Sequence, residues 1–468
     1  MKTFNFNRMK KYFALLLLPL AVACSKGPKE AVLAGKLVNS VDKSAYITSN
    51  NVTDTIKLAD DGTFTYKVML NKPQLYKLNV SRTQTVLYLA PGDSSYIEFD
   101  VSAPLDGPTF SADNKDIYSN IFKRKMYIRN NVGNWRGIYG LDLEAFTQKI
   151  DSLQNALNSM IDSLQSDSKD IISLEKERVK YQILSFKANY PEYNSYFSGK
   201  PFSVDSADYS FLDDVNMNLG DKLMFDDYAD LVSKYLQLKM EKNTKLKGIE
   251  DKDAVERLPI EFHFIDSLIS DAKVRDFLKM QKLEEEIQFG DFYRINSIVD
   301  SYLTSCQTPA FKDAVSSLYN KKMTLAPGQQ APVFTYNDIN GKPHSLTDFA
   351  GKLVYIDFWA TWCGPCRHEL PFLEQLQDAY KGKNIVFVSV SLDDNFEAWK
   401  KMEEEKEMKG VQLHADGAWA SDVAKKYQIK GIPTFFLVGA DGTIIAPNAP
   451  RPSSDEIKPL LNEELSKL

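Results

Sequence analysis

The stretch Leu353-Val-Tyr-Ile-Asp-Phe-Trp-Ala-Thr-Trp-Cys-Gly-Pro-Cys-Arg-His-Glu-Leu-Pro371 decides the fold of the last third of the chain. It opens as a strongly apolar run, which is typical of a strand buried on both faces of a sheet. Two cysteines spaced C-x-x-C, Cys363 and Cys366, follow at once, and a helical pattern continues behind them. The sequence therefore places a cysteine pair between a buried strand and the start of a helix.

Strands and helices alternate on both sides of this stretch. The segment 325–332 contains Pro and Gly and is typical of a linker, so the last domain is expected over residues 323–468. Interleaved helices and short apolar strands indicate an α/β fold with a sheet buried on both faces. The expected strands are 353–358, 385–392, 434–438 and 443–445, and the expected helices are 366–380, 396–408, 418–427 and a final helix capped by Ser453.

The cysteine pair has three possible roles: metal ligand, structural disulfide or reactive dithiol. A structural zinc site needs four ligands. The chain has only four cysteines and no second pair, and His344, His368 and His414 are scattered. A disulfide between residues three apart closes a very small loop and contributes little stability. The sequence therefore favours a reactive dithiol and predicts no metal site.

The position at a helix start explains why the first cysteine would be reactive. The helix dipole and the unpaired N–H groups of the first turn favour a thiolate and lower the pKa of the first thiol. The thiolate is the attacking species in disulfide exchange. Pro365 lies inside the first helical turn, where its missing N–H costs nothing.

The sequence around the pair resembles the thioredoxin superfamily, in particular the exported TlpA/ResA-like thiol-disulfide oxidoreductases. The resemblance rests on 358–367, Pro371 and Gly431-Ile-Pro-Thr434. It covers about 140 residues at the end of the chain and implies a thioredoxin-like domain whose redox group is the cysteine pair, without another cofactor. Cys363 would be the exposed nucleophile, and Cys366, one turn deeper, would resolve the mixed disulfide.

The resemblance gives roles to further residues near the pair. Pro433 matches the family's cis-proline, and an ordinary trans turn proline is the alternative from sequence alone. A cis bond would leave the Ile432 backbone free to pair with an extended substrate strand. Trp362 is expected to shield the dithiol, and Gly364 with Pro365 forms the dipeptide of reducing thioredoxins.

Asp357 is a carboxylate in an otherwise apolar strand, where a charge is costly unless it has a task or a partner. Its place relative to Cys363 is that of the buried acid in cytosolic thioredoxins. Many TlpA/ResA-like members have an uncharged residue there, so at this position the chain resembles thioredoxin itself more than it resembles those members. Burial should raise the pKa of Asp357 and let it accept a proton from Cys366. A hydrogen-bonded structural aspartate is the alternative.

The Gly-Pro dipeptide also predicts the direction of the reaction. Reducing thioredoxins carry it, and their potentials lie well below those of DsbA-type oxidants. We therefore expect a protein-disulfide reductase acting on disulfide-containing exported proteins. In an oxidising compartment it would need a membrane electron donor, a partner that the resemblance suggests. Family members act in cytochrome c maturation or reduce specific exported proteins.

The N-terminus predicts the compartment. Lys2, Arg8, Lys10 and Lys11 form a basic flank before a short apolar run that suits a signal peptide, expected over 1–23. Small residues followed by Cys24 resemble the lipobox of bacterial lipoproteins, which implies a lipid on Cys24, a tether over 24–30, and a membrane-anchored protein of the cell envelope facing the periplasm. An ordinary signal peptide with an incidental cysteine and a retained anchor are the alternatives.

Two regions separate the tether from the linker. From 31 to 105 apolar residues alternate with polar ones between turn signals, which predicts an antiparallel β-sandwich. From 106 to 322 the apolar spacing is helical, with expected breaks at 189–191 and 199–201. Cys306 is expected to be an inert, partly buried thiol, with a regulatory or resolving cysteine as the alternative. The β-region shows no residues for chemistry, so a spacer or docking role is expected for it.

The composition and motifs of the chain narrow the remaining classes of function and partner. The net charge of −6 and the lack of a basic stripe argue against a nucleic-acid partner. The alternative function is an envelope lipoprotein that binds a protein or glycan, with the last domain as an accessory. A peroxidase is a third hypothesis, because Ala331-Pro-Val-Phe334 appears in related domains, but the chain lacks a P-x-x-x-T-x-x-C pattern.

Overall fold

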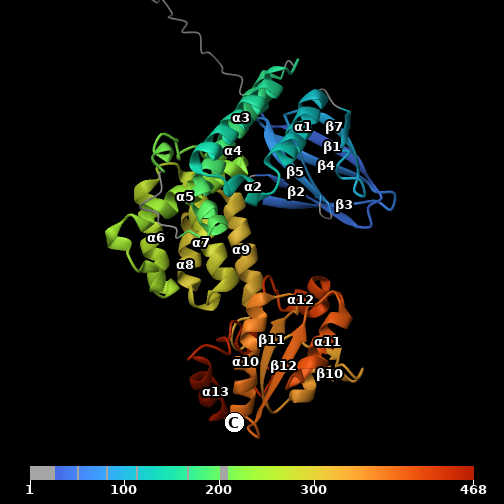
Figure 1. Cartoon of the computed structure of the whole chain (residues 1–468), viewed down its shortest axis with the longest axis vertical. Helices are drawn as coiled ribbons and strands as arrows, with labels where there is room; N and C mark the ends of the chain where they lie inside the picture. The colour runs from blue at the N-terminus through green and yellow to red at the C-terminus, as the bar shows by residue number, and fades with distance from the viewer. Residues whose placement is uncertain (1–26, 50–51, 81–82, 112–113, 166–167, 201–208) are drawn as a thin grey trace, which may run out of the picture. The chain divides into compact units, whose positions relative to one another are not determined.

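The computed structural model describes residues 27–49, 52–80, 83–111, 114–165, 168–200 and 209–468. The expected signal peptide, Cys24 and the start of the tether lie outside these residues. The chain divides into two compact units. The first holds the N-terminal strands, residues 114–134 and residues 152–177, and the second holds residues 135–151 and 178–468 (Figure 1).

The N-terminal strands form two four-stranded sheets, ordered β4-β1-β7-β8 and β3-β2-β5-β6. Side chains alternate in burial along β1, where Ala31, Leu33 and Leu37 point into the core. The predicted antiparallel β-region is confirmed except for one pair, since β1 and β7 run parallel. Long stretches of chain between these two strands make that direction possible. The bounds are β1 (Lys29–Val38), β2 (Ser44–Ser49), β3 (Val52–Lys57), β4 (Thr63–Leu70), β5 (Gln74–Val80), β6 (Thr83–Leu89), β7 (Ser94–Asp100) and β8 (Thr109–Ser111).

The first unit contains a buried ion pair. Arg124 and Glu175 pair with side chains that are 3% and 0% exposed. The Tyr88 hydroxyl donates to Glu175 (2.8 Å), and Arg124 Nε donates to the Asn120 side-chain oxygen (2.8 Å). Buried charges are tolerated when they are paired and hydrogen-bonded in this way.

The helical region follows the strands, as predicted. Its bounds are α1 (Lys115–Val132), α2 (Trp135–Tyr139), α3 (Leu143–Asp162), α4 (Lys169–Ser198), α5 (Asp226–Glu241), α6 (Ala254–Leu268), α7 (Ala272–Phe289), α8 (Asn296–Ser305) and α9 (Pro309–Met323). The break predicted at Pro191 is wrong, because α4 continues through it. Tyr190 and Asn194, on either side of Pro191, both donate hydrogen bonds to the Leu141 carbonyl (2.9 and 2.8 Å) and hold the helix in place.

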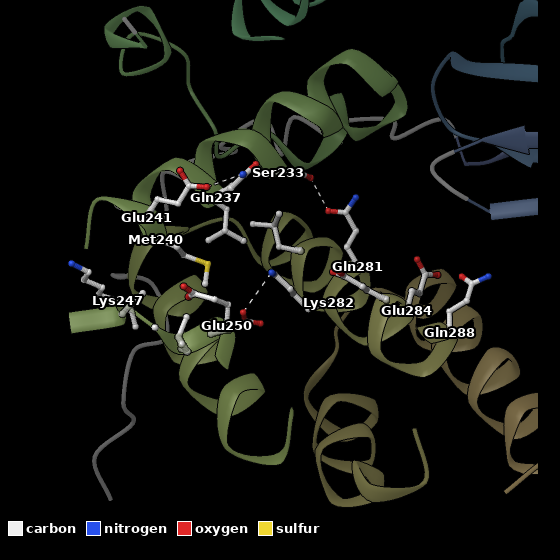
Figure 2. A pocket seen from close by; sticks show the side chains of 17 residues that line it. Ser233, Gln237, Met240, Glu241, Lys247, Glu250, Gln281, Lys282, Glu284 and Gln288 are labelled. Atoms are coloured by element: carbon white, nitrogen blue, oxygen red, sulfur yellow. Dashed lines mark hydrogen bonds and ion pairs between the residues drawn. The ribbon is translucent and has the colours of Figure 1, made fainter. Parts of the chain in front are cut away.

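A cavity of about 1060 Å³ opens among α5, α7 and residues 246–250, with Glu261 of α6 also in its lining (Figure 2). Leu236, Met240 and Leu278 supply apolar surface, and glutamate and glutamine side chains supply most of the rest. Lys282 lies 3.5 Å from Glu261 across one wall. The lining contains no cysteine or histidine, so thiol chemistry is not located in this cavity.

The last domain contains a five-stranded sheet in the order β13-β12-β11-β14-β15, with β11 at its centre. β11 pairs parallel with β12 and antiparallel with β14. Val354, Ile356 and Phe358 pack on one face, while Leu353 and Tyr355 pack on the other with α10 and α13. The bounds are β9 (Thr335–Asn337), β10 (Pro343–Ser345), β11 (Leu353–Trp359), α10 (Gly364–Ala379), β12 (Ile385–Ser391), α11 (Phe396–Lys406), β13 (Val411–His414), α12 (Asp422–Lys426), β14 (Thr434–Val438), β15 (Ile444–Ala446) and α13 (Ile457–Leu465).

Two details of the last domain differ from the prediction. The helix expected over 418–427 is interrupted, because Ser421 ends the short 3-10 helix η7 (Ala418–Ala420) and caps α12 through the Ala424 N–H. Ser453 does not cap α13, whose first residue is Ile457; it hydrogen-bonds to Glu369 instead. No helix in the described ranges has the length and apolar character of a membrane span.

Candidate active site

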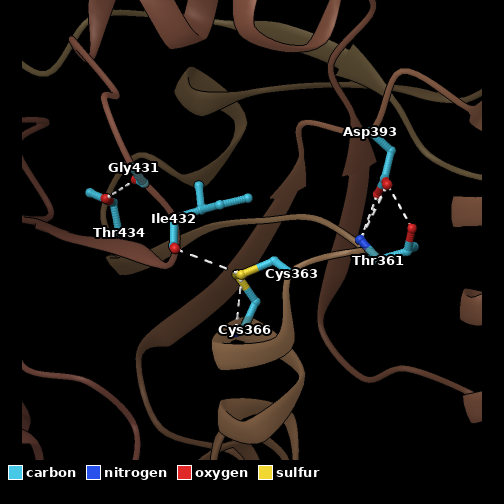
Figure 3. The surroundings of a disulfide bond; sticks show 7 residues. All are labelled: Thr361, Cys363, Cys366, Asp393, Gly431, Ile432 and Thr434. Atoms are coloured by element: carbon cyan, nitrogen blue, oxygen red, sulfur yellow. Dashed lines mark hydrogen bonds between the residues drawn. A yellow bond between two sulfur atoms is a disulfide. The ribbon is translucent and has the colours of Figure 1, made fainter. Parts of the chain in front are cut away.

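The cysteine pair closes a disulfide at the start of α10 (Figure 3). The two sulfurs are 2.09 Å apart, and the Cys363 sulfur accepts a hydrogen bond from the Cys366 backbone N–H (3.1 Å). Cys363 is therefore the N-cap residue of the helix, with its sulfur among the free N–H groups of the first turn. Cys363 is 5% exposed and Cys366 2%, so the first cysteine is less open than the sequence predicts.

Apolar side chains and one backbone carbonyl surround the disulfide. Trp359, Ala360 and Trp399 form a buried cluster with the two cysteines, and Ile432 packs against it. The Ile432–Pro433 peptide bond is cis, as the resemblance implies. The Ile432 carbonyl oxygen lies 3.7 Å from the Cys363 sulfur (Figure 3). The Ile432 backbone therefore borders the Cys363 sulfur directly.

Asp357 lies inside the central strand, on the face that α10 covers. It is 4% exposed and stands opposite Ser389 of β12 in the strand register. Burial raises the pKa of Asp357 to about 7; the nearby Ser389 hydroxyl opposes this rise, and the Glu369 carboxylate adds to it. The pKa of Asp357 is thus raised by burial, as the sequence predicts.

Glu369 is a second buried carboxylate on this face, and the sequence reasoning missed it. It is 5% exposed and accepts hydrogen bonds from the backbone N–H (3.0 Å) and hydroxyl (2.9 Å) of Ser453. A glutamate three residues after Cys366 on a helix shares the cysteine's face. That spacing was the available signal, but the Ser453 contact spans a distance in sequence that no local pattern reveals.

Asp393 is a third buried carboxylate that sequence reasoning did not single out. It is 1% exposed and follows β12. It accepts hydrogen bonds from the Thr361 backbone N–H (2.9 Å) and hydroxyl (2.6 Å), and from the Ser391 hydroxyl (2.7 Å). Thr361 lies two residues before Cys363, so Asp393 fixes the loop that presents the dithiol (Figure 3).

The remaining predicted site residues lie around the disulfide. Trp362 is 57% exposed, with its ring centre 6.4 Å from that of Trp419. Pro365 lies in the first turn of α10, as predicted. A side chain at Gly364 would meet no atom within 4 Å, so packing does not require glycine there.

Cys306 lies apart from this chemistry. Its sulfur is partly exposed and 3.4 Å from the Tyr302 hydroxyl, and burial raises the pKa of its thiol. A raised pKa disfavours the reactive thiolate, in line with the inert role expected for it. Within the described residues, no three His, Cys, Asp or Glu side chains are grouped so that they could hold a metal ion.

The comparisons with known proteins match the region that holds this site. Residues 327–446 match the model of the AhpC/TSA family. The chain is 31% identical over 151 residues to the thiol-disulfide oxidoreductase ResA of Bacillus cereus, covering 32% of this chain and 83% of that protein. It is 30% identical over 131 residues to ResA of Geobacillus thermodenitrificans, covering 28% and 72%.

A solved structure, the thioredoxin domain of a thiol-disulfide oxidoreductase from Bacteroides vulgatus, is 36% identical and covers 30% of this chain and 97% of that one, with a TM-score of 0.28. The family assignment rests on the sequence relatives, because most of ResA aligns with the last domain of this chain. With its strand, C-x-x-C helix and cis-proline in place, the chain belongs to the ResA-like thiol-disulfide oxidoreductases, and residues 327–446 form their thioredoxin-like AhpC/TSA domain.

Proposed function

We propose that this protein reduces disulfides in exported proteins of the cell envelope, using Cys363 and Cys366 as a dithiol. The observation that carries the proposal is the Cys363–Cys366 disulfide, placed at a helix N-terminus with the Ile432 carbonyl oxygen, beside the cis bond, 3.7 Å from the Cys363 sulfur. The Gly364-Pro365 dipeptide supports the reducing direction, since reducing thioredoxins share it.

The reaction proceeds by two exchanges. The Cys363 thiolate attacks one sulfur of the client disulfide, forms a mixed disulfide and releases the other client sulfur as a thiolate. Cys366 then loses its proton to the Asp357 carboxylate and attacks the Cys363 sulfur, which releases the second client thiolate. Two electrons pass to the client, the freed thiolates take up protons, and the enzyme ends as the disulfide. A membrane protein carrying a dithiol restores the reduced form.

Attachment of a lipid to Cys24 would hold this reductase at the membrane surface, facing the periplasm. The basic flank and short apolar run before Cys24 support this part of the proposal. Cytochrome c maturation and the repair of specific exported proteins are the processes that such a reductase would serve. Incorporation of labelled palmitate by the full chain, and its loss in Cys24→Ser, tests the attachment.

Insulin reduction in the presence of dithiothreitol tests the activity. We expect the full chain to speed insulin precipitation, and we expect Cys363→Ala to abolish the effect because the attacking sulfur is gone. Cys366→Ala should instead accumulate covalent adducts with clients, since the first exchange still occurs and the second cannot. A wild-type chain that leaves insulin oxidised would favour the binding-module alternative, and a Cys366→Ala variant without adducts would contradict the roles given to the two cysteines.

A further inference from the structure

The Cys363 sulfur is nearly covered, and this constrains how a client reaches it. Only 5% of Cys363 is exposed, and the Ile432 carbonyl oxygen lies 3.7 Å from its sulfur. A sulfur–sulfur bond forms at about 2 Å, so the client segment must rest on the residues around the cysteine. The side chains that border this point therefore contact the client in every turnover.

Two exposed tryptophans stand on this border. Trp362 is 57% exposed and Trp419 is 40% exposed, whereas Trp359 and Trp399 of the same domain are fully buried. The indole rings of Trp362 and Trp419 have centroids 6.4 Å apart and planes inclined by 40°. Adjacent exposed apolar groups on a protein surface mark interaction sites, and tryptophan supplies a large apolar area with few rotatable bonds.

The turn that carries Trp419 is rigid. Gly417 and Ala418 both have positive φ values, 86° and 47°, and the buried Ala418 and Ser421 hold the turn from below. The Ser421 N–H donates to the Ala418 carbonyl (3.1 Å), and the Ala420 N–H donates to the Gly417 carbonyl (2.7 Å). Left-handed backbone at an alanine is unfavourable and persists only where its surroundings enforce it. The backbone at Trp419 is thus fixed, and its partly exposed ring lies next to that of Trp362.

We infer that Trp419 is a specificity-determining residue, which with Trp362 binds a large apolar side chain next to the attacked cysteine of an extended client segment. The inference rests on the proposed disulfide-reductase function. The client is an extended protein segment because the indole pair adjoins the disulfide. Such a segment can follow Ile432 with its backbone while a neighbouring side chain reaches the two indole rings. A small disulfide has no neighbouring side chain to place on the indole pair, so its rate should not depend on Trp419.

Three disulfide substrates that share one leaving group test whether Trp419 recognises the client's side chain or supports disulfide reduction in general. Two peptides carry one cysteine linked to thionitrobenzoate, flanked by leucine in one and by glycine in the other, and the third substrate is the symmetric small disulfide of thionitrobenzoate. The full chain is reduced beforehand, mixed with excess substrate, and followed by the release of coloured thionitrobenzoate. The measured quantity is the second-order rate constant for each substrate.

We expect the wild-type chain to react faster with the leucine peptide than with the glycine peptide. Trp419→Ala should lower the rate constant for the leucine peptide by roughly threefold to tenfold, the size of one aromatic contact. The glycine peptide and the small disulfide should keep their rates within about twofold, and Trp419→Phe should recover most of the loss. Phe372→Ala, which removes a 37% exposed aromatic side chain from α10, is the matched control and should change none of the three rates.

The outcomes distinguish the role of Trp419 from the proposed reductase function. If the wild-type chain reduces all three substrates without preference, or if Trp419→Ala slows all three equally, the inference is overturned while the reductase stands. An unchanged reduction potential in Trp419→Ala supports a binding role, and a shifted potential contradicts it. If the wild-type chain reduces none of the substrates, the proposed function itself is wrong.

Discussion

At the scale of single residues, the chemistry of the site depends on a carboxyl group kept away from water. Asp357 lies in a strand whose seven side chains are all buried. The apolar surroundings stabilise its neutral form, so the folded protein binds a proton that the unfolded chain would release. The same property that suits Asp357 to proton transfer near neutral pH therefore lowers the stability of the fold once the group is ionised.

This conflict predicts a pH-dependent stability that Asp357 controls. The pKa rises from 3.8 to about 7 on folding, so its contribution to stability is present in full below pH 4 and is lost as the pH rises to 7. The full loss is about 4 kcal/mol, an upper bound for one group. Asp357→Asn should remove this dependence and make the oxidised protein more stable than wild type at pH 8, with little difference at pH 4.

Urea unfolding followed by tryptophan fluorescence measures this effect, because four of the five tryptophans lie in the last domain. Insulin reduction by the same variant should be slower, since Cys366 loses its proton acceptor. Equal stability of wild type and variant at pH 8 would contradict this prediction, because it would show that burial does not destabilise the ionised carboxylate of Asp357.

At the scale of elements, the loop between β11 and α10 is fixed by its contact with the end of β12. Asp393 accepts hydrogen bonds from Thr361 and Ser391, so one buried side chain joins two neighbouring strand ends. A hydrogen bond to a charged group contributes about 1.5–3 kcal/mol, and buried donors left without acceptors are costly. Loss of this carboxylate should loosen the loop that presents Cys363.

We therefore predict that Asp393→Asn lowers the free energy of unfolding of the last domain by about 2–3 kcal/mol, because an amide offers fewer acceptor sites to the same donors. Tryptophan-monitored urea unfolding of the oxidised protein is the measurement. Asp394→Asn, at the exposed neighbouring position, is the control and should stay within about 0.5 kcal/mol of wild type. A change of that small size in Asp393→Asn as well would mean that the loop does not depend on this contact.

The elements of the last domain were largely predictable, because each carries a local signal. The strand at 353–358, the strand at 434–438 and the C-x-x-C helix all follow from apolar spacing and capping chemistry. The predicted helix over 418–427 failed at Ser421, where the hydroxyl starts a new helix instead of lying within one. Asp393 and Glu369 could not be found in this way, because their partners come from other elements and only the fold brings them together.

At the scale of the whole molecule, the chain is two compact units with different internal supports. The second unit holds the dithiol, while the first depends on the Arg124–Glu175 pair and its hydrogen bonds. Removing one member of a buried ion pair costs about 3–5 kcal/mol, because the other charge stays buried without a partner. Because α4 continues from Glu175 into the second unit, damage to this pair should be greatest in the first unit and should leave the last domain unchanged.

We predict that Glu175→Gln lowers hydrogen-exchange protection of α1 and β6 amides by roughly a hundredfold or more, in line with that cost. Tryptophan-monitored unfolding of the last domain and insulin reduction should match wild type. Asp170→Asn, an exposed change on the same helix, is the control for α4. Slower insulin reduction by Glu175→Gln would reveal that the units are coupled.

The parallel pairing of β1 with β7 bears on how the chain is made. β1 has β4 on one side and β7 on the other, so one edge of β1 stays open until β7, which ends at Asp100, has left the ribosome. During that interval the nascent chain carries a strand with an open edge, the kind of surface that attracts other strands. A translation pause before Ser94 would prolong this exposure, and holdase chaperones should bind the growing polypeptide most strongly there.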